Sequence, residues 1–224
     1  MRGLDAEIHP IRLGEPVPET LDIYTIGGGE DTAQILAAEH LIADGGLTRA
    51  ATSGRPILAI CAGLQVLGES FRASGRIIDG VGLIDATTAG MQDRAIGEVS
   101  SAPTGAGVTA DLTEPLTGFE NHLGATILGP SAQPLGTLTR GNGNADQAAT
   151  ADLADDSSQR TYEGAVQGSV IATYMHGPAL ARNPQLADLL LAQAMGVALA
   201  DLEPIEIPAV DRLRVERFNA SEPP

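Results

Sequence analysis

The chain contains no lysine, and all 13 of its basic residues are arginine. A Walker A loop holds phosphates with its lysine and a Schiff base forms on a lysine amine, so both kinds of site are excluded. Cysteine occurs once, at position 61, so the chain has no internal disulfide and fits a reducing, cytoplasmic setting. No apolar run reaches the ~18 residues of a membrane span, and the N-terminus lacks a signal-peptide pattern.

Basic residues are also scarce relative to acidic ones, and the formal net charge is −16. This charge argues against nucleic acid and anionic membranes as partners. The length of 224 residues is enough for one sizeable core, and no internal repeat points to a second domain. We expect one domain over residues 1–204, followed by a charged, proline-rich and partly disordered tail over residues 205–224.

The first third of the chain alternates between strands and helices. Residues 21–26 and 56–60 read as buried strands, and each is followed by a turn of small residues and a helical segment, over residues 30–46 and 63–71. Such an alternation predicts a mostly parallel α/β sheet whose faces are covered by helices.

The later part of the chain changes character. Between residues 75 and 140, short β-rich pieces such as GRIIDGVGLIDATT, AIGEVS and PLGTLTR predict antiparallel or mixed strands. Residues 141–160 are polar and acidic, which predicts a flexible surface loop. Residues 168–175 predict a buried strand that ends at His176. A helix follows over residues 183–196, with Asn183 as N-cap, Pro184 at its first position and Gly196 at its end.

The single cysteine ends the second of these strands, in ILAICAGLQVLG. A strand, a sharp turn bearing a nucleophile and a helix need small residues two positions before and after the nucleophile, here Ala59 and Gly63. The turn would place the thiol at a helix N-terminus, whose partial positive charge favours thiolate, and would aim the N–H of Ala62 at a developing oxyanion. The alternative is a buried structural cysteine that packs as a small hydrophobe.

A thiol nucleophile needs a base, and the chain has four histidines. His176 follows a strand, as Cys61 does, and strand ends are where sites gather in open α/β sheets. His122, in the polar stretch GFENH between β segments, is the rival candidate. His40 reads as a surface residue of the first helix, and His9 has no assigned role.

These motifs resemble the class I (triad-type) glutamine amidotransferases, in the cobyric acid synthase-like branch. ILAICAGLQVLG is similar to the nucleophile motif of the family and TYMHGP to its histidine motif. IGGGED, GFENH, RGNGN and TYMHGP together resemble the glutaminase (GatD) subunits of lipid II isoglutaminyl synthases. The resemblance implies a single flavodoxin-like, three-layer α/β sandwich with a mostly parallel central sheet and additional antiparallel segments.

The resemblance also implies roles for individual residues. Cys61 would hydrolyse L-glutamine through a thioester, with His176 as base and the oxyanion held by Gly28, Gly29 and Ala62. Arg94, on a loop after a strand at residues 80–85, would hold the α-carboxylate of glutamine; the alternative is a solvated cation.

The resemblance further implies a partner. Ammonia would pass to a MurT-like Mur ligase subunit, which would hold ATP and magnesium and amidate the D-glutamate α-carboxyl of membrane-bound lipid II. No cofactor or metal is expected on this chain. Three other functions stay open, namely an amidotransferase for another synthetase such as a corrin-amidating one, a stand-alone cysteine hydrolase, and a catalytically silent scaffold that binds a partner.

Two features depart from the family pattern. Many members carry a glutamate two residues after the histidine, but Pro178 stands here, so the third triad member would come from elsewhere in the chain or from the partner. The family also opens with a further strand and helix before a segment like RGLDAEI. We therefore expect residues 6–9 to form a strand beside an unpaired edge or an apolar groove, which would be lined by Ile35 and Leu36 or by Ile23 and Tyr24.

Overall fold

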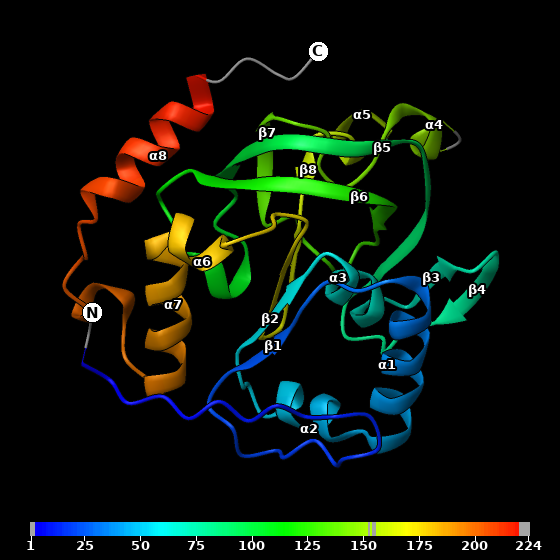
Figure 1. Cartoon of the computed structure of the whole chain (residues 1–224), viewed down its shortest axis with the longest axis horizontal. Helices are drawn as coiled ribbons and strands as arrows, with labels where there is room; N and C mark the ends of the chain where they lie inside the picture. Colours follow the sequence, from blue (N-terminus) through cyan, green and yellow to red (C-terminus); the bar gives the residue numbers. More distant parts are fainter. Residues whose placement is uncertain (1–2, 152, 154–155, 220–224) are drawn as a thin grey trace.

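The computed structural model describes residues 3–151, 153 and 156–219, and its first sheet has four strands (Figure 1). Their order is β1 (Tyr24–Ile26), β2 (Ile57–Ile60), β10 (Val170–Thr173) and β9 (Ala165–Gln167). The first three are parallel, and β9 runs antiparallel to β10. The predicted strands at residues 21–26, 56–60 and 168–175 are confirmed, although each is shorter than predicted.

Helices cover both faces of this sheet. Successive residues of a strand point to opposite faces, so one strand contributes to the buried clusters on both sides. Ile57 and Ala59 of β2 pack in one buried cluster with Leu64, from the short helix behind the cysteine. Leu58, between them, packs in a second cluster with Leu189. The helices concerned are α2 (Gly46–Thr52) and α3 (Ala62–Leu67) on the first side, and α7 (Pro184–Met195) on the second. The predicted mixed α/β fold is confirmed.

The second sheet has six strands and is largely antiparallel. Its order is β4 (Arg76–Asp79), β3 (Ser70–Ala73), β5 (Ala86–Pro103), β7 (Gly136–Arg140) and β8 (Tyr162–Glu163), with β6 (Leu116–Leu128) paired to β5. Figure 1 shows β5 and β6 side by side across the upper part of the molecule. The β-rich prediction for residues 75–140 is confirmed, but residues 80–85 are a loop, not a strand.

Helix ends follow the predicted signals in part. Helix α1 (Asp31–Asp44) ends at Gly45, whose φ is +68°, and α7 ends at Gly196, whose φ is also +68°. The helix predicted over residues 63–71 stops at Leu67, because the chain turns there into β3. Asn183 precedes α7 as predicted, but its side chain does not cap the helix. It bonds instead to the backbone N–H and carbonyl oxygen of Thr117 on β6, at 2.8 and 2.9 Å.

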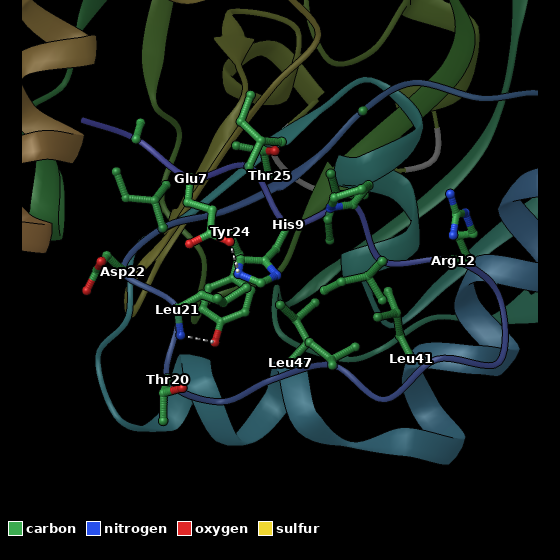
Figure 2. A pocket seen from close by; sticks show the side chains of 18 of the residues that line it. Glu7, His9, Arg12, Thr20, Leu21, Asp22, Tyr24, Thr25, Leu41 and Leu47 are labelled. Carbon is green, nitrogen blue, oxygen red and sulfur yellow. Dashed lines mark hydrogen bonds and ion pairs between the residues drawn. The ribbon is translucent and has the colours of Figure 1, made fainter. Parts of the chain in front are cut away.

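The N-terminal segment lies across the edge of the first sheet. Residues 6–9 do not form the predicted strand, and they are exposed, so among the described residues β1 has only β2 as a neighbour. A cavity of about 1290 Å³ separates residues 4–13 from β1, α1 and the end of α7 (Figure 2). Its lining includes Ile23, Tyr24 and Leu36, as predicted for a groove at this place, but not Ile35.

The segments that were expected to form a flexible loop and a partly disordered tail contain helices. Residues 141–160 hold α4 (Gln147–Thr150) and α5 (Asp156–Gln159), while residues 152 and 154–155 lie outside the described part. The tail forms α8 (Pro208–Asn219), which packs beside α6 (Ala179–Arg182), and residues 220–224 lie outside the described part. Within the described residues, no helix is long and apolar enough to cross a membrane.

Asn144 explains why the start of the expected loop is ordered. It has no exposed surface, and its side chain bonds both the N–H and the carbonyl oxygen of Gly164, at 2.7 and 2.9 Å. Gly164 adopts a φ of +67°, and a Cβ there would lie 2.3 Å from the Ala172 carbonyl oxygen. Asn144 therefore ties the RGNGN stretch to the turn between β8 and β9, next to β10.

We predict that Asn144→Ala lowers the free energy of unfolding by about 2–4 kcal/mol, because it leaves two buried backbone groups of Gly164 without partners. The matched variant Asn142→Ala alters an exposed asparagine two residues earlier and should lower it by only about 1 kcal/mol. Urea unfolding of both variants measures the difference. An equal loss of unfolding free energy in both variants would show that the buried hydrogen bonds from Asn144 to Gly164 add no more stability than an exposed side chain does.

Candidate active site

Cys61 sits at a sharp turn between β2 and α3, as the sequence predicts. Its backbone has φ +54° and ψ −107°, and positive φ is uncommon outside glycine. Its N–H donates to the carbonyl oxygen of Thr173, at 2.8 Å, which continues the pairing of Ile60 with Thr173. The turn therefore begins where β2 leaves its parallel neighbour β10.

Small residues around the turn are required by close packing. A Cβ on Gly63 would lie 2.6 Å from the carbonyl oxygen of Ile26, so only glycine lets α3 approach β1. Ala59 has no exposed surface. A Cβ on Gly28 would lie 3.6 Å from the Cys61 Cβ and 3.9 Å from its Sγ, so the loop after β1 lies directly against the thiol.

The thiol is not held as a thiolate, contrary to the expectation from its place at a helix N-terminus. Burial raises the pKa of Cys61, and this outweighs the Ala62 N–H and the Arg94 guanidinium, which both lower it. Helix α3 has only six residues, so its end supplies little opposing charge. In the resting site the sulfur is a neutral thiol that needs a base.

His176 lies three residues beyond the end of β10, the strand next to β2. Its backbone N–H donates to the carbonyl oxygen of Phe119, at 2.8 Å, which fixes it against β6. Burial lowers the pKa of His176, and the nearby His122 adds to this effect. The imidazole is therefore neutral near physiological pH and able to accept a proton.

No carboxylate orients His176 among the residues that the structure describes. Its Nε2 is buried without a hydrogen-bond partner, and Pro178 occupies the position two residues on. The structure does not bring another acidic side chain to that nitrogen.

The other histidines lie in different surroundings. His122 is buried within β6, so GFENH is part of a strand and not a polar stretch between strands. Its Nδ1 lies 2.9 Å from the Gly124 carbonyl oxygen and must carry the hydrogen, because a carbonyl only accepts. His40 is half-buried and lines the N-terminal cavity, where His9 pairs with Glu7 at 3.3 Å (Figure 2).

The residues expected to stabilise an oxyanion, Gly28, Gly29 and Ala62, lie in the loop before α1 and at the first position of α3. Gly28 and Ala62 both lie against Cys61. Gly29 precedes α1. A Cβ on it would meet Ala33 of that helix, and its carbonyl oxygen accepts from the Gln34 side chain.

Arg94 is not on a loop after a strand, as expected, but within β5. It is exposed there, and it is close enough to influence the Cys61 thiol.

A buried polar cluster lies behind the cysteine and the histidine, and motif reasoning missed it. Glu163, which has no exposed surface, accepts hydrogen bonds from the Thr173 hydroxyl at 2.5 Å and from the Tyr174 N–H at 3.0 Å. The Tyr174 hydroxyl in turn bonds Gln65 and Thr126, at 3.1 and 2.7 Å. The cluster thus joins β10 to α3 and β6.

Glu120 anchors the other side of this cluster. It accepts from the backbone N–H groups of Asn142 and Gly143, at 2.8 and 2.9 Å. Burial raises the pKa of Glu120, but His122 and these two hydrogen bonds outweigh it, so the pKa is lowered. The His122 ring stacks on Tyr174, with centroids 3.7 Å apart. Glutamates within the β-rich stretches YEGAV and GFENH were the available signal for this cluster.

Within the described part of the chain, no group of three or more histidine, cysteine, aspartate or glutamate side chains could hold a metal ion.

Comparison with known proteins agrees with this geometry. Residues 4–184 match the family model of the CobB/CobQ-like glutamine amidotransferase domain. The chain belongs to this family. It is 33% identical over 177 residues to the GatD subunit of lipid II isoglutaminyl synthase (glutamine-hydrolyzing) from Streptococcus pneumoniae, covering 78% of this chain and 61% of that protein. With the Staphylococcus aureus GatD subunit it shares 32% identity over 188 residues, covering 83% and 69%.

Other amidotransferases are similar at lower levels. A cobyric acid synthase from Sphingopyxis alaskensis is 30% identical over 202 residues, which cover 86% of this chain but 35% of that protein. A glutamine amidotransferase crystal structure has a TM-score of 0.53 at 20% identity, covering 78% of this chain and 80% of that one. That likeness establishes the fold. The match of residues 4–184 to the family model shows that this chain is a glutamine amidotransferase domain.

We predict a pH dependence of stability from Glu163. Burial raises the pKa of Glu163 from 4.5 to about 7, so between these values the folded chain keeps a proton that the unfolded chain has released. The free energy of unfolding should fall as pH rises through this window, by about 1.4 kcal/mol per pKa unit, and level off above it.

Glu163→Gln should remove this slope, because an amide does not titrate. The matched variant Glu120→Gln should keep the slope and lower the free energy of unfolding across the whole pH range, because the pKa of Glu120 lies below 4.5 and its carboxylate stays charged there. Chemical unfolding between pH 5 and pH 8 measures both. An unchanged slope in Glu163→Gln would show that Glu163 is not the titrating group.

Proposed function

We propose that the chain is a glutaminase that hydrolyses L-glutamine to glutamate and ammonia through a thioester on Cys61. The observation that supports this most is the strained turn that holds Cys61 against Gly28 and Ala62 at the end of β2, beside the end of β10, the strand that leads to His176. Family membership makes glutamine the substrate to test.

The proposed reaction uses Cys61, His176 and backbone groups of this chain, together with one water molecule. Neutral His176 takes the proton of the Cys61 thiol as the sulfur attacks the side-chain amide carbon of glutamine. The negative charge on the amide oxygen is stabilised by backbone N–H groups at Gly28 and Ala62. His176 then gives the proton to the leaving nitrogen, and ammonia departs. A water molecule, deprotonated by His176, attacks the thioester and releases glutamate.

Arg94 supplies the recognition of the amino-acid end of the substrate. Its guanidinium fits a carboxylate, and it is the cation that acts on the Cys61 thiol. The α-carboxylate of L-glutamine would bind there, which places the side-chain amide towards the sulfur.

The acceptor of the ammonia would be a MurT-like Mur ligase partner that binds ATP and magnesium and works in the cytoplasm. It would amidate the D-glutamate α-carboxyl of lipid II to D-isoglutamine, in peptidoglycan synthesis. The names of the two GatD relatives, at 32–33% identity, support this acceptor. A cobyric acid synthase-type amidation is the second candidate, supported by similarity to the Sphingopyxis alaskensis protein.

Reconstitution distinguishes the two acceptors. The chain is mixed with a candidate Mur ligase-like subunit, L-glutamine, ATP, magnesium and lipid II, and the stem peptide is analysed by mass spectrometry. Formation of D-isoglutamine supports the first acceptor. Glutamine-dependent amidation of a corrin carboxylate with a corrin synthetase, and none of lipid II, would favour the second.

We predict that Cys61→Ala abolishes glutamine hydrolysis and that His176→Ala nearly does so, while both variants keep the wild-type circular dichroism spectrum. Cys61→Ala removes the nucleophile, and His176→Ala leaves a neutral thiol without a base. The measurement is the release of ammonia and of glutamate from L-glutamine, each followed with a coupled enzyme assay. If His176→Ala retains activity and His122→Ala loses it, His122 is the base.

We also predict that Gly28→Ala lowers kcat by roughly 100-fold without affecting folding, because a methyl group 3.9 Å from Sγ would occupy the space of the oxyanion. Its backbone has no positive φ that would strain an alanine. The matched control is Gly27→Ala, whose Cβ would meet no atom within 4 Å and should leave kcat near the wild-type value. Comparable activity in the two variants would remove Gly28 from the oxyanion site.

A further inference from the structure

Arg94 lies in a stretch of β5 where the pairing register with β6 shifts. The pairing of these strands is regular up to Gly90, opposite Gly124, and resumes at Ala95, opposite His122. Residues 91–94 of β5 therefore face a single residue of β6, which makes a large bulge. Arg94 is the last residue of the bulge, so its position depends on what holds it to the neighbouring strand.

The side chain of Asn121 on β6 holds the Arg94 guanidinium through a hydrogen bond. The Arg94 Nη1 donates to the Oδ1 of Asn121 at 3.0 Å, and both side chains are exposed. Among the described residues, no carboxylate forms an ion pair with Arg94. The guanidinium is thus oriented by a neutral acceptor that uses one of its five N–H groups and leaves its charge uncompensated.

The same strand also carries the backbone contact of the proposed base. Phe119, two residues before Asn121 on β6, accepts the hydrogen bond from the His176 N–H. Alternate residues of a strand point to the same face, so Phe119 and Asn121 share the exposed face of β6. This short segment of β6 therefore sets the place of His176 and the place of the Arg94 guanidinium together.

We propose that Asn121 is a positioning residue for glutamine specificity, which fixes the Arg94 guanidinium where it receives the α-carboxylate of L-glutamine. This inference rests on the proposed glutaminase function. It explains why an asparagine suits this position and an aspartate would not. A carboxylate at position 121 would pair with Arg94 and repel the carboxylate of the substrate.

Steady-state kinetics with L-glutamine test the proposal on Asn121→Ala, Asn121→Asp, Arg94→Ala and the double variant Arg94→Ala/Asn121→Ala. Asn121→Ala should raise KM by roughly 3- to 10-fold and leave kcat within about twofold, because one hydrogen bond that orients a binding group is lost. Asn121→Asp should raise KM more than Asn121→Ala does. Arg94→Ala should raise it by roughly 10- to 100-fold.

The double variant distinguishes positioning from an independent effect. If Asn121 acts through Arg94, adding Asn121→Ala to Arg94→Ala should change KM no further. Ile96→Thr is the matched control, because Ile96 lies directly opposite Asn121 on β5 and is 55% exposed. It should leave KM unchanged. The amide 4-aminobutanamide, which is glutamine without its carboxylate, should be hydrolysed equally by wild type and Asn121→Ala.

Wild-type KM in Asn121→Ala, or additive effects in the double variant, would overturn the inference. Calorimetric binding of L-glutamine to Cys61→Ala, with and without Asn121→Ala, separates it from the proposed reaction. Binding that weakens with Asn121→Ala, together with a wild type that releases no ammonia, would keep the recognition site and reject the glutaminase. Glutamine hydrolysis that is unaffected by Asn121→Ala would keep the glutaminase and reject the role of Asn121 in recognition.

Discussion

The hydrogen bond from the Cys61 N–H to the Thr173 carbonyl oxygen, at 2.8 Å, joins the ends of β2 and β10. Because these strands are parallel and adjacent, their carboxyl ends meet at one edge of the sheet, and the residues after them share one site. The Thr173 hydroxyl in turn donates a hydrogen bond to the buried Glu163 carboxyl group. The place of the thiol, the approach to His176 and the buried polar cluster all depend on this junction.

The electrostatics of the junction favour a neutral pair. Burial raises the pKa of the Cys61 thiol and lowers the pKa of His176, so neither group carries a charge at rest. In the proposed reaction, charge would develop when the proton moves from sulfur to imidazole, in surroundings where the Ala62 N–H and the Arg94 guanidinium favour the anion.

Much of the first sheet could be predicted from the sequence, because local signals there agree with the packing. Small residues flank Cys61 where the backbones of α3 and β1 touch, and Gly196 ends α7 in a left-handed conformation. Predictions failed where order comes from distant contacts. The helices within residues 141–160 follow an anchor at Asn144, and Arg94 was misplaced because nothing local marks a four-residue bulge. Composition favoured a loop over residues 141–160, and the expected strand at residues 80–85 placed Arg94 on a loop after it.

The central claim is a covalent thioester on Cys61, and intact-protein mass spectrometry after acid quenching tests it most directly. The protein is mixed with excess L-glutamine and stopped within milliseconds, and His176→Ala is treated in the same way. We expect wild type to gain the mass of one glutamyl group, located on the peptide that carries Cys61, and Cys61→Ala to gain nothing. An unchanged mass in wild type while ammonia is being released, or an adduct on another peptide, would contradict the account.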